Sequence, residues 1–244
     1  MNSQEFLKAF IEDCKYYDLE NKELKEILKS VKIKNKRILD IGAGIGRLSF
    51  PLAKHAKEVV ALEKDKRFSE YFNKRKNKKV KFVNQSLESY AKKSKSRKFD
   101  VILLAWPTFN SKFIGLIKKF MCEKSKFIFI TCTNDSDYET IIDKIAPGGY
   151  FNKDTRNKEG FIKQLPKKFR LVKKKIINTD NIYPNKNTAF RVIKNAVTLW
   201  FGTKFDDTTD LKLKGLIKQH ENNKKVTFEE KVLFYVMEKN LKCK

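Results

Sequence analysis

A glycine-rich turn between a buried strand and a helix is the feature that most constrains this chain. The run Arg37–Ile41 is strand-like, residues 42–46 read Gly-Ala-Gly-Ile-Gly, and a helical pattern follows from about 46 to 56. Glycines there permit a tight turn and bring a ligand close to bare main chain. The helix N-terminus beyond the turn adds free N–H groups and a partial positive charge. The pattern therefore predicts a nucleotide-type binding loop.

The spacing of the glycines narrows the class of ligand. A dinucleotide-binding turn has the spacing GxGxxG, which would require its third glycine at position 47, where this chain has Arg47. Asp40 also precedes the turn, and a carboxylate there would repel a pyrophosphate group. The loop therefore departs from the pyrophosphate-binding pattern.

Strands and helices alternate strictly through the first half of the chain. Amphipathic helices are expected over 3–18 and 21–31, before the first strand. The expected strands and helices that follow are 37–41, 46–56, 58–63, 66–76, 80–84, 100–105, 110–121 and 126–132. This β-α alternation predicts a parallel sheet with right-handed crossovers.

The rest of the chain is less regular. A helix at 136–145, a loop at Pro147-Gly148-Gly149, a sixth strand at 169–177, helices at 187–201 and about 208–221, and a last strand at 232–237 are expected. The segment of about 180–224 is either a lid for substrate recognition or an ordinary pair of packing helices. We expect one domain over 1–244, with a helical cap (1–34), a cofactor-binding core (35–133) and a substrate-side half (134–244).

The run Leu39–Leu48 resembles motif I of the class I S-adenosylmethionine-dependent methyltransferases, (D/E)xGxGxG. The resemblance covers about residues 35–133 well and the C-terminal third in outline. It implies an α/β fold, a Rossmann-like three-layer sandwich with a seven-stranded, mostly parallel sheet in the order 3-2-1-4-5-7-6. It implies S-adenosylmethionine as cofactor, held at Asp40, Gly42, Ala43, Gly44, Gly46, Glu63, Lys64, Ser86, Leu87, Ala105 and Trp106.

Glu63 and Ser86 are the expected contacts of the nucleoside. Glu63 ends the second strand, where a carboxylate can accept both ribose hydroxyls. The alternative is that Glu63-Lys64-Asp65-Lys66 is a run of solvated charges that opens a helix. Ser86 stands where family members commonly carry an acid for the adenine amino group, and a hydroxyl accepts more weakly than a carboxylate. The backbone N–H of Leu87 can also serve the ring.

Trp106 follows the fourth strand, beside the topological switch point where open α/β sheets bind ligands. The resemblance places it near the transferable methyl group, although a core aromatic is the competing interpretation. Amino-directed relatives often carry (N/D)PP(Y/F) here, whereas residues 105–108 read Ala-Trp-Pro-Thr. The side chain that would hold a target amino group is missing, which disfavours adenine dimethylation.

The formal net charge is +26, and lysines greatly outnumber arginines. A nucleic-acid partner would explain the charge, because phosphate neutralisation releases counterions. Recognition of bases and phosphates favours arginine, however, and a lysine excess beside abundant Ile, Asn and Phe indicates a compositional bias. We therefore expect lysines spread evenly and not gathered beside Trp106, with RNA possible as a partner but not favoured.

Cysteine and histidine usage indicates neither disulfides nor a metal centre. Cys14, Cys122, Cys132 and Cys243 form no CxxC pair, and the histidines are His55 and His220. The longest apolar runs are far shorter than the roughly 20 residues of a membrane span, and the N-terminus does not follow a secretory pattern. We expect no metal, no membrane association and a cytoplasmic protein.

The sequence thus predicts a methyltransferase that uses S-adenosylmethionine, with a small molecule or a protein as acceptor. An RNA methyltransferase and a non-catalytic cofactor-fold binding protein are the alternatives. No catalytic residue is assigned, because the sulfonium carries its own electrophile and orientation supplies much of the rate. The acceptor and the oligomeric state are not readable from the sequence.

Overall fold

The structure is a computed structural model that describes residues 3–94, 97–107, 110, 112–133, 135–146 and 150–240, with backbone alone for residue 3 and residues 150–156. It divides into two compact units. The helical unit comprises Met1–Glu23, Cys132–Lys153 and Ile177–Val232. The sheet unit comprises Leu24–Thr131, Asp154–Ile176 and Leu233–Lys244. The predicted single domain with its three sections is not tested by this division and stays a prediction.

The sheet has the predicted order. Its strands run β3-β2-β1-β4-β5-β8-β6, and a short additional strand, β7, pairs with β8. Neighbours among the first five strands are parallel. The strands are β1 (Arg37–Ile41), β2 (Glu58–Glu63), β3 (Val80–Asn84), β4 (Phe99–Ala105), β5 (Met121–Cys132), β6 (Phe169–Tyr183), β7 (Glu221–Asn222) and β8 (Lys225–Lys239). The Rossmann-like α/β prediction is confirmed, with eight strands in place of seven.

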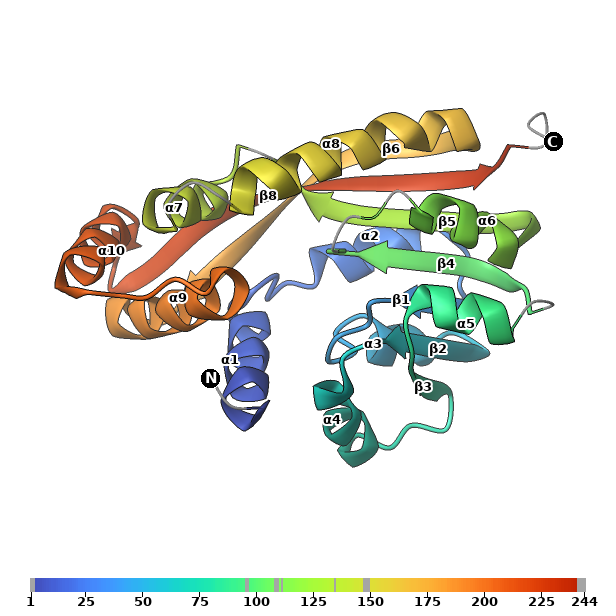
Figure 1. The fold of residues 1–244 in the computed structure, drawn as a ribbon, viewed down its shortest axis with the longest axis horizontal. Helices are drawn as coiled ribbons and strands as arrows, with labels where there is room; N and C mark the ends of the chain where they lie inside the picture. The colour runs from blue at the N-terminus through green and yellow to red at the C-terminus, as the bar shows by residue number, and fades with distance from the viewer. Residues whose placement is uncertain are drawn as a thin grey trace. The chain divides into compact units, whose positions relative to one another are not determined.

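The core of the sheet unit lies between the strands and the helices that cover one face (Figure 1). The central strands are almost continuously apolar because both faces of a parallel sheet are buried. One core cluster joins side chains of β1, β2, β4 and β5 to helices α5 (Leu87–Lys93), α6 (Lys112–Phe120) and α8 (Tyr150–Lys168). These crossover helices fix the strand ends that form the candidate site.

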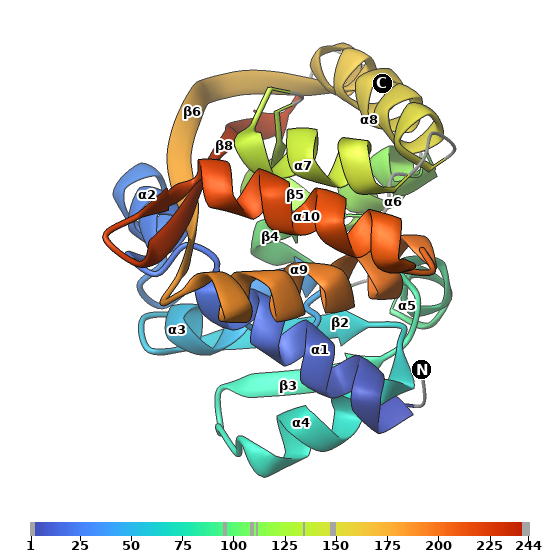
Figure 2. The same cartoon turned by 90° about the vertical axis from the view of Figure 1, so that its left-hand side faces the viewer.

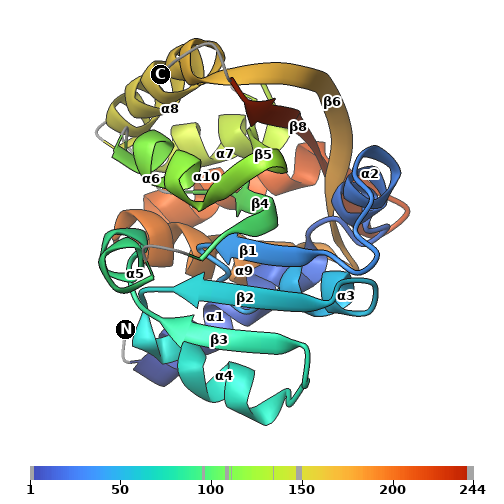
Figure 3. The same ribbon diagram turned by 90° about the vertical axis from the view of Figure 1, so that its right-hand side faces the viewer.

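Shorter helices complete the sheet unit (Figure 3). They are α3 (Ser49–Ala53), the 3-10 turn η1 (Lys66–Phe68) and α4 (Ser69–Lys74), together with α2 (Lys22–Ser30), which begins in the helical unit. The expected helix at 46–56 is shorter than predicted, because the turn continues through Leu48 and the helix begins only at Ser49. The glycine turn therefore extends over more residues than the sequence indicates.

The helical unit packs its helices around a second core (Figure 2). Its helices are α1 (Ser3–Tyr16), α7 (Asp137–Ile145), α9 (Lys186–Phe201) and α10 (Asp207–Gln219), which match the predicted positions closely. Helix α9 lies against α1 and α10, and α10 also contacts α7. The predicted segment of about 180–224 thus contains packing helices, and a role as a lid stays a prediction.

Some elements differ from the sequence-based prediction. Helix α8 was not expected, since it is strongly polar and contains Pro166 in its last turn. Strands β6 and β8 are both longer than predicted. Their additional residues alternate in burial and form no continuous apolar run, so the sequence pattern did not indicate a strand there. The predicted loop at 147–149 lies outside the described residues. Among the helices that the structure describes, none is long and apolar enough to span a membrane.

Candidate functional site

The glycine turn after β1 is fixed by its own backbone and by the end of β2. The N–H groups of Gly42 and Ala43 both donate to the carbonyl of Leu62, at 2.8 and 3.1 Å, and Gly46 N–H donates to the Ala43 carbonyl at 2.7 Å. Gly42, Gly44 and Gly46 have φ angles of 72, 54 and 75°, in the left-handed region that favours glycine. The predicted turn thus has the conformation that its glycines allow.

Gly46 is required for packing as well as for backbone conformation. A Cβ atom there would lie 2.7 Å from a Phe50 ring atom and 2.8 Å from a Phe72 ring atom. A Cβ on Gly42, in contrast, would meet nothing within 4 Å. Gly46 therefore admits the aromatic rings of α3 and α4, whereas the backbone at Gly42 is open.

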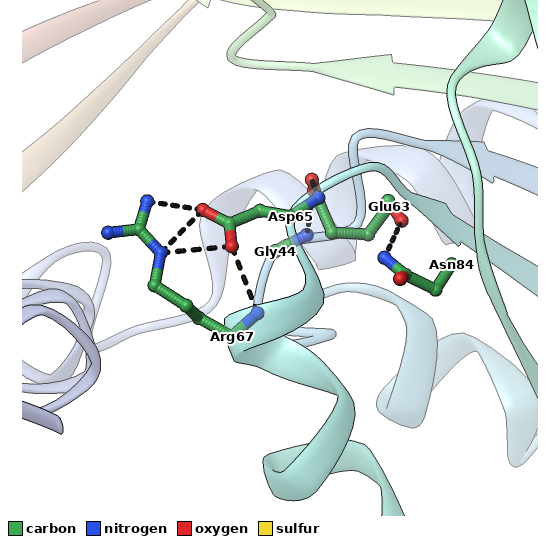
Figure 4. Close-up of polar contacts among 5 residues, drawn as sticks. All are labelled: Gly44, Glu63, Asp65, Arg67 and Asn84. Atoms are coloured by element: carbon green, nitrogen blue, oxygen red, sulfur yellow. Dashed lines mark hydrogen bonds and ion pairs between the residues drawn. The ribbon is translucent and has the colours of Figure 1, made fainter. Parts of the chain in front are cut away.

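The carboxylate of Glu63 lies directly at this turn (Figure 4). Its Oε2 accepts from Gly44 N–H at 3.1 Å and its Oε1 from Asp65 N–H at 2.9 Å, while the side chain is buried. Asn84, its register partner on β3, donates from Nδ2 to the Glu63 carbonyl at 2.9 Å. An ionised carboxylate has about four acceptor positions, so the contacts to Gly44 and Asp65 leave acceptor capacity.

The charges that follow Glu63 separate into distinct roles. Asp65 caps η1 by accepting from Arg67 N–H at 2.9 Å, and the Arg67 guanidinium pairs with the same carboxylate. This hydrogen bonding lowers the pKa of Asp65. Lys64 is exposed. The interpretation of this run as charges that open a helix therefore holds for Asp65, whereas the Glu63 side chain contacts the glycine turn at Gly44.

Asp40 stabilises the turn by linking the end of β1 to the start of α3. Its buried carboxylate accepts from the Ser49 hydroxyl at 2.5 Å, which ties the end of β1 to the first residue of α3. Burial raises the pKa of Asp40 to about 6, against the hydrogen bond from Ser49 and the charge of Arg47. The negative charge of Glu63 raises it further. Asp40 therefore shapes the loop through Ser49, a partner that the sequence analysis did not identify.

Ser86 and Leu87 lie where β3 passes into α5. Ser86 is the N-cap of α5, and its Oγ accepts from Ser89 N–H at 3.1 Å. Leu87 is the first helical residue, and its side chain is buried in the core. The N-cap role was not foreseen, although a serine just before a helix is its ordinary signal. One acceptor position and the hydroxyl hydrogen of Ser86 are available for a further partner.

Ala105 and Trp106 lie at the end of β4, next to the end of β1 in the sheet register. Trp106 has a φ of 53° and donates its N–H to the Ile130 carbonyl at 2.9 Å. A positive φ is uncommon for a bulky residue. Its side chain is 39% exposed, so the core-aromatic interpretation is wrong. Thr108, the last residue of the Ala-Trp-Pro-Thr segment, lies outside the described residues.

The predicted contacts therefore occupy one edge of the sheet unit. The ends of β1, β2, β3 and β4 adjoin by register, which places Asp40, Glu63, Asn84 and Ala105 along the carboxyl edge. The contact of Asn84 with Glu63 was not predicted, and the signal for it is the position of Asn84 opposite Glu63 on the neighbouring strand. Within the described part of the chain, no three His, Cys, Asp or Glu residues gather as metal ligands would.

Comparison with known proteins gives partial matches in sequence. The family model described as ribosomal RNA adenine dimethylase matches residues 12–105. A probable ribosomal RNA small subunit methyltransferase A of Methanosphaera stadtmanae is 50% identical over 50 residues, covering 20% of this chain and 18% of that protein. An uncharacterized RNA methyltransferase of Mycoplasma mobile is 33% identical over 106 residues, covering 40% and 28%. The chain thus spans less than a third of the curated relatives it matches.

Solved structures share the fold over most of the chain. A putative methyltransferase from Bacillus halodurans aligns with a TM-score of 0.55 at 12% identity, over 88% of this chain and 98% of that one. The N-methyltransferase NodS from Bradyrhizobium japonicum, solved with S-adenosyl-L-homocysteine, aligns with a TM-score of 0.51 at 12% identity, over 90% and 87%. Over residues 12–105 the chain is thus similar to S-adenosylmethionine-dependent methyltransferases in sequence, and over most of its length it has the fold of the solved methyltransferases named above.

Proposed function

We propose that the chain transfers a methyl group from S-adenosylmethionine to RNA. The family model and both curated relatives carry RNA in their descriptions. This similarity favours RNA over the small-molecule or protein acceptor that the sequence alone favoured. The observation that carries the methyltransferase part is the Glu63 carboxylate on the Gly44 N–H, at the carboxyl edge of a parallel sheet.

The residues present fit the nucleoside end of the cofactor. In our proposal, the ribose hydroxyls donate to the acceptor positions that Glu63 retains beside Gly44 and Asp65. The open backbone at Gly42 lets the cofactor approach closely. Ala43, Gly46 and Asp40 would maintain the turn, and Lys64 would lie exposed beside it.

The adenine end would be held by groups different from the family's usual acid. The Ser86 hydroxyl has one acceptor position beyond the Ser89 contact and one hydrogen to donate. The N–H of Leu87 belongs to the first turn of α5, where backbone donors have no partner within the helix. These groups are weaker than a carboxylate, so we expect the ribose contact to contribute more to cofactor affinity.

The acceptor would be positioned by Trp106. Its exposed indole at the end of β4 offers a face on which an unstacked base can lie, and such stacking contributes about 1–3 kcal/mol per base. The cofactor, when bound, supplies the electrophilic methyl on its sulfonium. The chain then has to orient the acceptor atom and exclude water, which needs no acid-base pair.

A second acceptor class has one specific observation in its favour. Ala105 stands where amino-directed relatives carry Asn or Asp, so that position offers no side chain to hold a target amino group. A small-molecule or protein acceptor, whose nucleophile would not need that group, would fit this departure.

Methyl transfer onto fractionated acceptors tests the proposal. Wild-type protein, the Glu63→Ala variant and the control Glu229→Gln are incubated with methyl-labelled S-adenosylmethionine and deproteinised small-subunit ribosomal RNA in physiological salt. Glu229 is a half-buried carboxylate on β8 of the helical unit. We expect label in RNA with the wild type and the control and its loss with Glu63→Ala.

The other outcomes assign the alternatives. Label in a protein or small-molecule fraction of cell extract, with none in RNA, would replace RNA by the second acceptor class. Micromolar binding of S-adenosylmethionine without label in any fraction would indicate a non-catalytic binding protein.

A further inference from the structure

The segments that lead into the parallel strands are strongly basic. Residues 31–36 precede β1, 54–57 precede β2, 75–79 precede β3 and the described residues 97–98 precede β4. Every charged side chain in these segments is Lys or Arg, accompanied by His55, and none contains Asp or Glu. Because the strands are parallel, all of these segments lie at the amino edge of the sheet. We call these segments the amino rim.

Backbone hydrogen bonds join the segments of the amino rim that precede β1, β2 and β3. Asn35 N–H donates to the His55 carbonyl at 3.4 Å, and Lys57 N–H donates to the Lys36 carbonyl at 2.9 Å. Val59, at the start of β2, donates to the Lys79 carbonyl at 2.8 Å. Figure 3 shows the amino ends of β1, β2 and β3 side by side. The backbones of these three segments are therefore neighbours in space.

The acids at this edge neutralise only some of these cations. Glu58 pairs with Arg37 and Arg97, and Asp100 pairs with Lys36. Lys54, Lys57, Lys76, Lys78 and Lys79 are all exposed, and no carboxylate of the described chain forms an ion pair with them. The amino rim thus has a surplus of exposed positive charge.

The described turns at the opposite edge of the same sheet lack this surplus of positive charge. Across the turns 42–48, 64–65, 85–86 and 106–107, the cations are Arg47 and Lys64. Asp65 is paired with Arg67 of the following helical turn, and the acids Asp40 and Glu63 lie at the adjoining strand ends. Of these described turns, the one that holds Trp106 contains no lysine. The even spread of lysines over the whole surface stays a prediction, although the topology collects at the amino edge basic segments that are far apart in sequence.

The stabilisation of helix C-termini by cations explains only part of the positive charge of the amino rim. Cations complement the negative end of a helix dipole only within the last turn. That accounts for Lys54 and Arg75, which cap α3 and α4. Lys57, Lys76, Lys78 and Lys79 lie beyond those ends.

We propose that the amino rim binds the phosphate backbone of the RNA whose methyl acceptor lies at the opposite edge. This inference rests on the proposed RNA methyl transfer. Lysines are point charges that suit phosphate contacts without reading bases. At about 3.3 Å per residue, strands such as β1 and β4 separate the rims by roughly 20 Å. Only an RNA of several nucleotides, extended or folded, can contact both edges, so the substrate class is a polynucleotide and not a free nucleotide.

Salt-dependent RNA binding tests the amino rim. The rim variant Lys54→Gln, Lys76→Gln, Lys78→Gln, Lys79→Gln is compared with a control of equal charge change, Lys186→Gln, Lys212→Gln, Lys218→Gln, Lys225→Gln. The control lysines are exposed residues of the helical unit. Affinity for deproteinised small-subunit ribosomal RNA is measured by filter binding at several KCl concentrations, and calorimetry with S-adenosylmethionine verifies that each variant is folded.

We expect the rim variant to bind RNA at least tenfold more weakly than wild type. The slope of log affinity against log salt concentration should become shallower by about three. The control should remain within about threefold of wild type. Equal losses in the two variants, or no loss in the rim variant, would overturn the inference. Failure of the proposed function is seen separately, as RNA that binds wild-type protein but receives no methyl label.

Discussion

The two units hold their partly or fully buried carboxylates in different ways. In the sheet unit, Glu63 accepts a hydrogen bond from Gly44 N–H, and Asp40 accepts one from the Ser49 hydroxyl. All four residues lie within a short stretch of the chain. In the helical unit, Asp13 accepts from the Tyr138 hydroxyl at 3.3 Å, and burial raises its pKa to about 6. The first arrangement is a local motif, whereas the second joins helices distant in sequence. This contrast predicts that ligand binding depends on the first arrangement and stability on both.

The largest expected effect is on cofactor affinity. Glu63→Ala would remove the proposed acceptor of both ribose hydroxyls, and hydrogen bonds to a charged group contribute about 1.5–3 kcal/mol each. We expect S-adenosylmethionine affinity to fall at least 100-fold by calorimetry. Glu229→Gln, in the helical unit, should stay within about twofold of wild type. A similar loss in both variants would break the assignment of cofactor binding to the sheet unit.

Glycine substitutions compare backbone strain in the two units. Gly46 and Gly202, which caps α9, both have left-handed φ angles, of 75 and 66°. A Cβ meets Phe50 and Phe72 at Gly46 but nothing within 4 Å at Gly202. We expect Gly46→Ala to lower the free energy of unfolding by about 3 kcal/mol and Gly202→Ala by about 1 kcal/mol. Denaturant titration checks both, and equal costs would contradict the close packing at Gly46.

The pH dependence of stability compares Asp40 with Asp13. Both carboxyls have a pKa of about 6 in the folded protein against an ordinary value of 3.8, so the folded state binds more protons between these values. The free energy of unfolding should therefore fall as pH rises from about 4 to about 6, by about 2 kcal/mol for each group. Asp40→Asn and Asp13→Asn should each remove their share of this fall in denaturant titrations. An unchanged slope in Asp40→Asn would mean that Asp40 titrates normally.

The smallest effect concerns matched helix caps. Ser86 caps α5 in the sheet unit, and Ser136 caps α7 in the helical unit by accepting from Glu139 N–H. Each change to Ala should cost about 1 kcal/mol of stability. Ser86→Ala should also weaken S-adenosylmethionine binding a few-fold, whereas Ser136→Ala should leave it unchanged. Equal cofactor affinity in the two variants would exclude Ser86 from the adenine site.

The sheet unit was largely predictable because its signals are local. The apolar strands, the glycine turn and the carboxylate at position 63 occur in chain order, and parallel topology then dictates which strand ends meet. Ser49 and Asn84 were missed, because a hydroxyl in a helix and an amide at a strand end become informative only when the register is known.

The helical unit was less predictable for the same physical reason. Its helices were located by their apolar periodicity, but Asp13, Tyr138 and Tyr183 carry no spacing that relates them. The polar helix α8 lacks a strong apolar stripe, and the far ends of β6 and β8 alternate in burial. The basic amino rim likewise becomes visible only after folding collects its segments.

A crystal structure of the chain with S-adenosyl-L-homocysteine tests the central claim most directly. We expect the ribose hydroxyls within hydrogen-bond distance of the Glu63 carboxylate, with the nucleoside along residues 42–46. A nucleoside bound elsewhere, or a Glu63 carboxylate that contacts only Gly44 and Asp65 while ligand is present, would contradict it.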